Sequence, residues 1–406
     1  MGAPPLRRNR DFLLLQAGQL LSTAGTQATT IAYPLLVLAL TGSPAQAGVV
    51  TFARLVPSAL LALPAGLAAD RYDRRSLMIA ADAARACALA ALAATILADR
   101  VDFWEIPVVA FLEGAGATMF AAAQAGALRS VMRPAQLPAA VGAQEARDSI
   151  VRLGGPPLGG VLFELGRAVP FLVDALSYAA SIASLAMMRT PFQQAREPAT
   201  AGLRAQMSEG FRFLWSRPFL RACAFLFAFG NFTLPGIFLV IVVVGRGQGL
   251  GGGAIGLLLA SFGAATLLGS LASPLMRRAF SMRAILWIEL WVSLTIVAFL
   301  VWPSVYVLTA AILPQALVIP VTNSVVVGYR VAVTPDRLLG RVETVRSTIS
   351  LLIAPLGPLV AGLLLGATSA RVTVAVFAGF SAVLLLWGTL SPAIRHAPAL
   401  ADLQAL

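Results

Sequence analysis

The chain has 406 residues, of which 58% are hydrophobic and 12% charged, and its mean hydropathy is +0.83. Soluble domains carry about 25% charged residues, so this composition predicts an integral membrane protein. The two cysteines, Cys87 and Cys223, lie in apolar runs, which predicts neither a disulfide framework nor a metal site. The single histidine, His396, lies near the C-terminus, which excludes a Ser-His-Asp triad and a His-ligated metal centre.

A helix needs about 20 mostly apolar residues to cross a bilayer. The chain contains twelve such stretches, and we expect an all-α integral membrane fold of twelve transmembrane helices. The expected spans are 12–40, 46–69, 76–98, 104–131, 137–164, 169–188, 219–245, 253–276, 282–301, 304–329, 342–367 and 371–390.

The distribution of arginine predicts the orientation of these spans. All 30 basic residues are arginines. With a cytoplasmic N-terminus, 21 of them fall on the inner side, five fall within spans, and the outer side holds only Arg100, Arg167, Arg246 and Arg371. We therefore expect both termini to lie in the cytoplasm. The net charge of +12 then faces the cytoplasm and anionic lipid headgroups, so a nucleic-acid partner is not needed to explain it.

The chain is expected to divide into two related six-helix halves. The stretch that begins at Gly48 resembles the one that begins at Gly256, and 133–141 and 155–160 resemble 334–342 and 357–362 in the same order. We expect residues 1–190 and 218–406 to form these pseudo-symmetric halves, joined by a cytoplasmic linker at 191–217. Apolar residues at helical spacing in 203–214 predict an amphipathic interfacial helix within the linker. Repeated halves are typical of transporters with a substrate site near the midplane.

The charged stretch GLAADRYDRR, residues 66–75, resembles the loop 2–3 signature of the major facilitator superfamily, G-x-L-A-D-R-x-G-R-R. Further matches follow in order: LTGSPAQAG, VRLGGPPLGG, FLVDALSY, EGFRFLWSRP and TPDRLLGRV. The set is similar to the drug exporter branch that includes enterobactin exporters and macrolide efflux proteins. One departure concerns span 1, where this branch often has an acidic residue after the glycine. Here Thr26 follows Gly25, so span 1 offers no carboxylate there.

The resemblance implies an inner gate at the cytoplasmic end of span 2. In the family fold span 11 lies beside this loop, so Asp70 can face the positive end of that helix. Arg85 follows Asp82 by three residues and shares its helix face. The expected gate residues are Asp70, Arg71, Arg74, Arg75, Asp82, Arg85, Arg341 and Arg346. The alternative is that the loop arginines only follow the positive-inside rule.

The GPPLGG sequence in span 5 resembles the antiporter motif of proton-driven exporters. Prolines remove helix hydrogen bonds, and glycines let a neighbouring helix approach closely. We interpret Gly155, Pro156, Gly159 and Gly160 as a bend that seals the outer half. Close packing alone is the alternative interpretation.

The resemblance also implies that spans 1, 4, 7 and 10 line the substrate cavity. Polar residues recur at helical spacing in span 1, and a few polar and aromatic side chains lie in the other spans. The cavity candidates are Gln19, Thr23, Gln27, Thr30, Tyr33, Arg54, Phe120, Gln124, Arg152, Asn231, Gln315 and Asn323. Apolar walls with a few polar groups suit an amphiphilic ligand.

Two membrane carboxylates are candidates for proton coupling. Glu113 lies nine residues after Trp104, an expected interfacial anchor, and is therefore about 14 Å deep in the bilayer. Asp148 is the second candidate, although its expected ion pair with Arg152 would keep it charged. The alternative role for Glu113 is to neutralise Arg54 or Arg152. Asp174, in the span 6 match, is expected to be structural.

The sequence therefore predicts a monomeric transporter of the inner membrane that exports an amphiphilic small molecule in exchange for protons. A drug, a siderophore or a natural product would fit. An importer or facilitator on the same fold, and a scaffold or sensor that transports nothing, are alternatives. No metal or cofactor is expected. No catalytic motif of an enzyme and no P-loop occurs in the chain.

The predicted topology can be tested with a membrane-impermeant thiol reagent in intact cells. The background would have Cys87 and Cys223 replaced by alanine. A cysteine at Ala195 should resist the reagent because we place this residue in the cytoplasm, whereas a cysteine at Gly249 should react. The opposite labelling pattern would contradict the predicted orientation.

Overall fold

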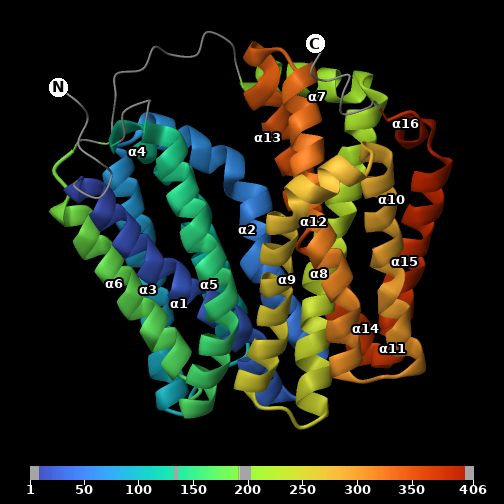
Figure 1. The fold of residues 1–406 in the computed structure, drawn as a ribbon. Helices are drawn as coiled ribbons and strands as arrows, with labels where there is room; N and C mark the ends of the chain where they lie inside the picture. The colour runs from blue at the N-terminus through green and yellow to red at the C-terminus, as the bar shows by residue number, and fades with distance from the viewer. Residues whose placement is uncertain (1–8, 132–135, 191, 193–202, 398–406) are drawn as a thin grey trace. The chain divides into compact units, whose positions relative to one another are not determined.

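The computed structural model describes residues 9–131, 136–190, 192 and 203–397, and all regular secondary structure within them is helical (Figure 1). Six long helices make up the N-terminal part. They are α1 (Arg10–Thr41), α2 (Pro44–Arg71), α3 (Arg74–Leu97), α4 (Glu105–Val131), α5 (Leu137–Leu165) and α6 (Val169–Met187).

The C-terminal part begins with a short amphipathic helix and then repeats the pattern of long apolar helices. Its elements are α7 (Leu203–Ser216), α8 (Pro218–Gly247), α9 (Gly252–Ala279), α10 (Met282–Val292), η3 (Ser293–Val297), α11 (Ala298–Val301), α12 (Val305–Val333), α13 (Asp336–Ile353), α14 (Leu356–Ala367), α15 (Ala370–Leu390) and α16 (Pro392–Arg395). The predicted span at 282–301 includes a 3₁₀ turn, and the span predicted at 342–367 begins six residues earlier and is divided between α13 and α14.

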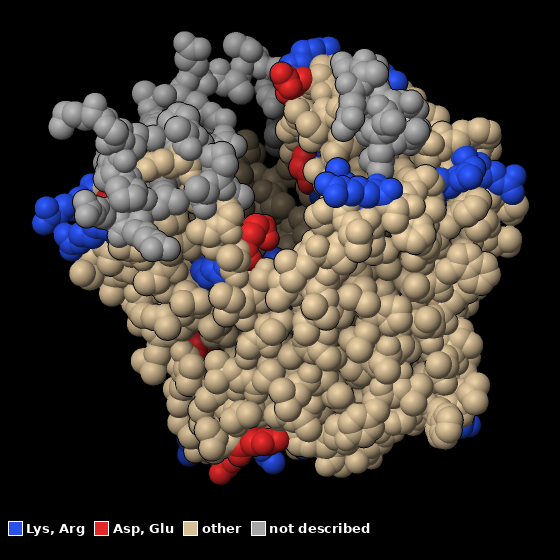
Figure 2. Space-filling model, viewed as in Figure 1, with Lys and Arg blue, Asp and Glu red and all other residues tan. Residues whose placement is uncertain are grey.

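Ten helical segments of the described residues are long and apolar enough to cross a membrane. The helices α1 and α5 have sufficient length but carry more polar residues. Together they give the twelve expected spans, so the all-α membrane fold is confirmed. On the face drawn in Figure 2, charged side chains gather towards the two ends of the helices, and the surface between them is mostly uncharged.

Helix boundaries follow from local capping chemistry. Asn9, Ser43 and Asp73 each accept a backbone hydrogen bond at the start of α1, α2 and α3, which satisfies an amide that has no partner within the helix. Gly42 ends α1 with φ of 66°, a backbone conformation that favours glycine. Pro44 then occupies the first position of α2, where its missing N–H costs nothing.

The chain forms two compact units. Unit 1 contains residues 1–197 with 245–260, and unit 2 contains residues 198–244 with 261–406. In unit 1, α1 packs against α5 and α6, and α4 packs against α2 and α3. The carboxylate of Asp11 accepts hydrogen bonds from the backbone amides of Arg189 (3.2 Å) and Thr190 (2.8 Å), which ties the start of α1 to the segment after α6.

In unit 2, the amphipathic helix α7 packs against α13. Glu209 on α7 forms ion pairs with Arg337 and Arg341 on α13, and Gly210 lies directly against the backbone of Arg341. An apolar core around Phe219 and Tyr329, whose rings meet edge to face at 4.8 Å, lies beneath these contacts. The predicted helix in the linker is therefore confirmed from Leu203 to Ser216. Its position on a membrane interface stays a prediction.

Glycines allow the closest helix contacts in unit 1. A Cβ atom at Gly159 of α5 would lie 2.6 Å from Cα of Ala28 in α1, and one at Gly114 of α4 would meet the carbonyl of Arg54 in α2. By contrast, Gly154 has no atom within 4 Å of the corresponding position. Close packing of α1 with α5 therefore depends on Gly159 and not on Gly154.

These two glycines make a matched pair for a stability test. Gly159→Ala should lower the free energy of unfolding by about 1–3 kcal/mol, because the added methyl group overpacks the contact with α1. Gly154→Ala should have little effect. The apparent melting temperature of the purified protein in detergent would measure both. Equal melting temperatures for the two variants would contradict this account of α5 packing.

Candidate functional site

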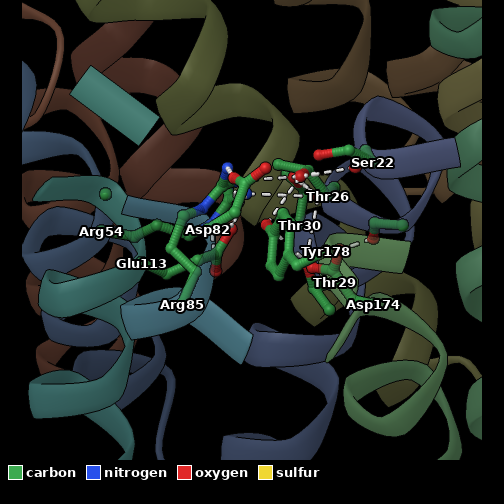
Figure 3. A network of polar contacts seen from close by, with 12 residues as sticks. Ser22, Thr26, Thr29, Thr30, Arg54, Asp82, Arg85, Glu113, Asp174 and Tyr178 are labelled. Carbon is green, nitrogen blue, oxygen red and sulfur yellow. Dashed lines mark hydrogen bonds and ion pairs between the residues drawn. The ribbon is translucent and has the colours of Figure 1, made fainter. Parts of the chain in front are cut away.

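Five ionisable side chains meet inside unit 1, and we call them the charged cluster (Figure 3). They are Arg54 from α2, Asp82 and Arg85 from α3, Glu113 from α4 and Asp174 from α6. Charged groups are costly in a bilayer core and mark transport pathways more often than packing sites. The cluster is therefore the strongest candidate for a functional site in this unit.

Arg54 and Glu113 form a two-pronged ion pair. Nε of Arg54 donates to Oε2 of Glu113 at 3.1 Å, and Nη2 donates to Oε1 at 3.0 Å. The Glu113 side chain is only 1% exposed, so water cannot solvate its carboxylate. The guanidinium of Arg54 supplies the hydrogen bonds in place of water. Arg54 also donates to the backbone carbonyl of Thr26 and lies over the ring of Tyr33.

Arg85 connects the other members of the cluster. Its guanidinium pairs with Asp82 at 3.2 Å and lies 3.9 Å from Oε1 of Glu113. It also donates to Oγ1 of Thr26 at 3.0 Å and lies 3.9 Å above the ring of Tyr178. Two carboxylates, a hydroxyl and an aromatic face thus share one cation, which is 5% exposed.

Asp174 is bound by hydroxyl groups. Thr29 donates to Oδ2 at 2.9 Å, Ser177 donates to Oδ1 at 3.1 Å, and Tyr178 donates to Oδ2 at 3.3 Å. The residue is fully buried. Its carboxyl group lies against Gly25 of α1, where a side chain would collide with it.

Helical periodicity explains the local part of this arrangement. Asp82 and Arg85 are three residues apart on α3, and Asp174 and Tyr178 are four apart on α6, so each pair shares a helix face. Thr26 and Thr29 do the same on α1. Among the described residues, no group of His, Cys, Asp and Glu side chains has an arrangement that could hold a metal ion.

Two contacts of the charged cluster were predicted from the sequence. Glu113 has the Arg54 partner that the alternative interpretation required. The expected pairing of Asp82 with Arg85 is also present. Thr26, Thr29 and Tyr178 were not predicted as site residues, and Asp174 was expected to have a structural role apart from the cluster. The FLVDALSY match and the hydroxyl residue after Gly25 were the available signals.

The residues predicted to form an inner gate do not form a single group in the structure. Asp82 and Arg85 lie eight and eleven residues after Arg74, about 12–17 Å along α3, so they belong to the charged cluster and not to the loop. At the loop, Asp70 pairs with Arg74 at 3.7 Å. Arg74 also donates to the carbonyl of Phe192.

Each of the remaining gate arginines has a partner within its own unit. Arg75 donates to the carbonyl of Thr190, and Arg71 lies over the ring of Tyr72. In unit 2, Arg341 pairs with Glu209. Arg346 pairs with Glu343, which also pairs with Arg330. Arg74 and Arg75 thus donate to carbonyls after α6, and Asp82 pairs with Arg85, so within the described part of the chain Asp82 has no ion pair with the arginines of the loop.

Asp148 differs from the expectation. It accepts hydrogen bonds from the adjacent Arg147 at 2.8 and 3.0 Å, and Arg147 also donates to Gln16 of α1. Arg152, its expected partner, is exposed.

The cavity candidates differ in exposure. Within their own units, Gln19, Tyr33, Phe120 and Gln315 are buried and pack against other helices. The remaining candidates keep accessible surface and are Thr23, Gln27, Thr30, Arg54, Gln124, Arg152, Asn231 and Asn323. Only this second set can meet a ligand without rearrangement of the helices.

The glycine motif of α5 makes contacts along two sides. Gly155 faces Gln27 and Gly159 faces Ala28, both on α1, whereas Gly160 lies against Gly252 at the start of α9. At the end of the same helix, Glu164 accepts a hydrogen bond from the backbone amide of Gly253 at 3.0 Å. The helix continues through Pro156. These contacts agree with the packing interpretation, and the sealing role stays a prediction.

The ion pair of Arg54 with Glu113 predicts a specific pattern of stability. Glu113→Gln alone leaves a guanidinium without its main partner, and breaking a buried pair in this way costs about 3–5 kcal/mol. The double variant Arg54→Gln with Glu113→Gln removes both charges and should recover much of the folded yield. Yield and melting temperature in detergent measure the difference. If the single variant were as stable as the parent, the pair would have no structural role.

Comparison with known proteins places the whole chain in one family. The sequence profile of the transmembrane secretion effectors, a family of the major facilitator superfamily, matches residues 2–404. The multidrug efflux pump Tap of Mycolicibacterium fortuitum is 29% identical over 402 residues, which cover 94% of each chain. The MFS-type transporter YfiS of Bacillus subtilis is 26% identical over 239 residues, or 56% of each chain.

Solved structures share the fold at low sequence identity. The nucleoside transporter NupG gives a TM-score of 0.70 with 14% identity and covers 96% of this chain and 100% of its own. A bacterial homologue of the lysosomal transporter Spinster gives 0.73 with 16% identity, covering 97% of this chain and 98% of its own. The chain is therefore a multi-pass membrane protein that belongs to the transmembrane secretion effector family, a branch of the small-molecule secondary transporters of the major facilitator superfamily.

Proposed function

We propose that this transporter exports an amphiphilic small molecule across the cytoplasmic membrane in exchange for protons. The observation that carries the proposal is the charged cluster. Two arginines and three carboxylic acids lie among membrane helices, next to a stripe of hydroxyl and amide side chains on α1. Four of the five are buried, and Arg54 keeps some accessible surface. A purely structural core would not need five ionisable groups at this depth, where each is costly.

The relatives support the direction of transport. Tap is a multidrug efflux pump, and its similarity extends over 94% of this chain. In unit 1, the accessible candidates combine polar groups, such as Thr23 and Gln27, with long apolar helices. Such a surface suits ligands that are largely apolar with a few polar groups. A drug or a self-made natural product fits this class, and a siderophore is a further candidate.

The experiment uses inside-out membrane vesicles and the fluorescent aromatic cation ethidium as the probe. The vesicle lumen corresponds to the outside of the cell. When the lumen is acidified, the protein should concentrate ethidium there as protons leave, and a protonophore should abolish the accumulation. Ethidium accumulation that does not depend on the proton gradient would contradict proton coupling. Ethidium loss from preloaded vesicles under the same gradient would favour an importer.

Asp70 provides a test of gating in the same vesicles. This exposed carboxylate pairs with Arg74, the first residue of α3. Asp70→Asn removes this surface ion pair, worth about 0–1 kcal/mol, and should slow ethidium accumulation while equilibrium binding of ethidium is unchanged. Asp73→Asn, which keeps an N-cap side chain, serves as the control in the same loop. Parental rates in Asp70→Asn would exclude a gating role.

A further inference from the structure

The charged cluster holds more acid than base. Asp82, Glu113 and Asp174 are carboxylic acids, and only Arg54 and Arg85 are cations. If all five were ionised, the cluster would carry one net negative charge within the membrane. Such a charge is costly, and a single proton neutralises it. One of the three carboxylic acids is therefore suited to bind and release a proton.

Ion pairs separate the three acids. Glu113 accepts two hydrogen bonds from Arg54 and lies near Arg85. Asp82 pairs with Arg85. Within the part of the chain that the structure describes, Asp174 forms hydrogen bonds with hydroxyl groups and no ion pair. A proton on Glu113 or Asp82 would break an ion pair, whereas a proton on Asp174 would not.

The hydroxyl groups around Asp174 can serve both of its protonation states. Thr29 lies within reach of the carbonyls of Gly25 (3.3 Å) and Thr26 (3.0 Å) as well as the Asp174 carboxylate. A hydroxyl has one hydrogen and can also accept. Thr29 therefore donates to the ionised carboxylate, or it donates to a carbonyl and accepts the proton of the neutral acid.

The other two hydroxyls have the same freedom. Ser177 can turn from the carboxylate to the backbone carbonyl of Asp174 at 2.7 Å. Tyr178 can turn to Oγ1 of Thr26 at 2.8 Å. No backbone movement is needed for either change. The site thus binds a proton by reorienting hydroxyl groups.

The charged groups that face Asp174 come from three helices. Arg85 and Asp82 lie on α3, Glu113 lies on α4, and Tyr178 lies one turn away on α6 itself. From α1 come only the neutral groups of Gly25, Thr26 and Thr29. On α5, Arg147 and Asp148 bind each other and Gln16, so they do not contact Asp174.

Hydroxyl groups connect Asp174 to the remaining cluster. Tyr178 lies between Asp174 and Thr26, and Thr26 accepts from Arg85. Thr26 is half-buried, and the hydroxyl of the exposed Thr30 bonds to its carbonyl. A change of charge on Asp174 therefore alters the hydrogen bonds and the electrostatic environment of Arg85. Arg85 in turn pairs with Asp82 and lies close to Glu113.

We infer that Asp174 is the group that carries the exchanged proton, and that Thr29, Ser177 and Tyr178 form its proton-dependent hydrogen-bond cage. This inference rests on the proposed proton exchange. In each cycle the carboxylate binds one proton from the outer side, which changes the cluster charge from −1 to neutral, and releases it to the inner side. Glu113 remains paired with Arg54 and positions the cluster.

The first test detects the proton directly and does not depend on transport. Infrared spectra of the purified protein in lipid, recorded as a function of pH, should show the carbonyl stretch of one buried protonated carboxylic acid that disappears as pH rises. Asp174→Asn should remove this band, and Asp82→Asn should retain it. A band that persists in Asp174→Asn, or the absence of any such band in the parent protein, would overturn the inference.

A second variant covers the case in which Asp174→Asn fails to fold. Thr29→Val removes a hydroxyl that bonds to Asp174, and it should change the pH midpoint of the infrared band. The neighbouring Thr30→Val is the control, because the Thr30 hydroxyl bonds to the carbonyl of Thr26 and not to Asp174. An unchanged midpoint in Thr29→Val would contradict the cage.

Transport then separates this inference from the proposed function. In the ethidium assay, Asp174→Asn should lose accumulation driven by the proton gradient but keep downhill ethidium exchange. Asp99→Asn, which changes an exposed carboxylate in the loop after α3, should keep both. Full accumulation by Asp174→Asn would exclude Asp174 as the carrier. If the parent protein itself ignored the proton gradient, the proposed function would fail, while the infrared result would still decide whether Asp174 holds a proton.

Discussion

The guanidinium of Arg85 is the contact on which the organisation of unit 1 depends. It is buried among α1, α3, α4 and α6, and it binds an aspartate, a threonine hydroxyl and a tyrosine ring while facing Glu113. A cation at this depth is stable only if such partners surround it. Its presence therefore requires four helices to keep fixed positions around one point, and small residues such as Gly116 give its side chain the necessary space.

Around this cation, the unit separates groups with fixed charge from one group whose charge can change. The Arg54–Glu113 pair joins two oppositely charged groups through two direct hydrogen bonds. Asp174 has only hydroxyl partners, each of which can donate in another direction. Glu113 and Asp174 are both buried carboxyl groups, but they differ in their partners. A guanidinium faces Glu113, whereas hydroxyl groups face Asp174.

The cluster also relates two features of the sequence that had no common explanation. In the drug exporter branch that this sequence resembles, an acidic residue often follows the span 1 glycine. In this chain the residue after Gly25 is Thr26. In the folded unit, the carboxyl group of Asp174 lies against Gly25, and Tyr178 bonds to Thr26. The acid that α1 lacks is therefore supplied by α6 at nearly the same place. The glycine is needed because a side chain at position 25 would occupy the site of the carboxyl group.

The sequence by itself determined the number and order of the membrane helices and most of their limits, because apolar length and capping are local properties. It also determined contacts one turn apart, such as Asp82 with Arg85. Only the tertiary structure decided that Glu113 meets Arg54, 59 positions away, and that Asp174 meets Thr29, 145 positions away. Helical periodicity shows which residues share a helix face. Which other helix packs against that face depends on how glycines and buried charges allow the helices to approach one another. For the same reason the sequence could name Glu113 either as a proton-coupling candidate or as the partner of Arg54 or Arg152, and only the packed unit shows that its partner is Arg54.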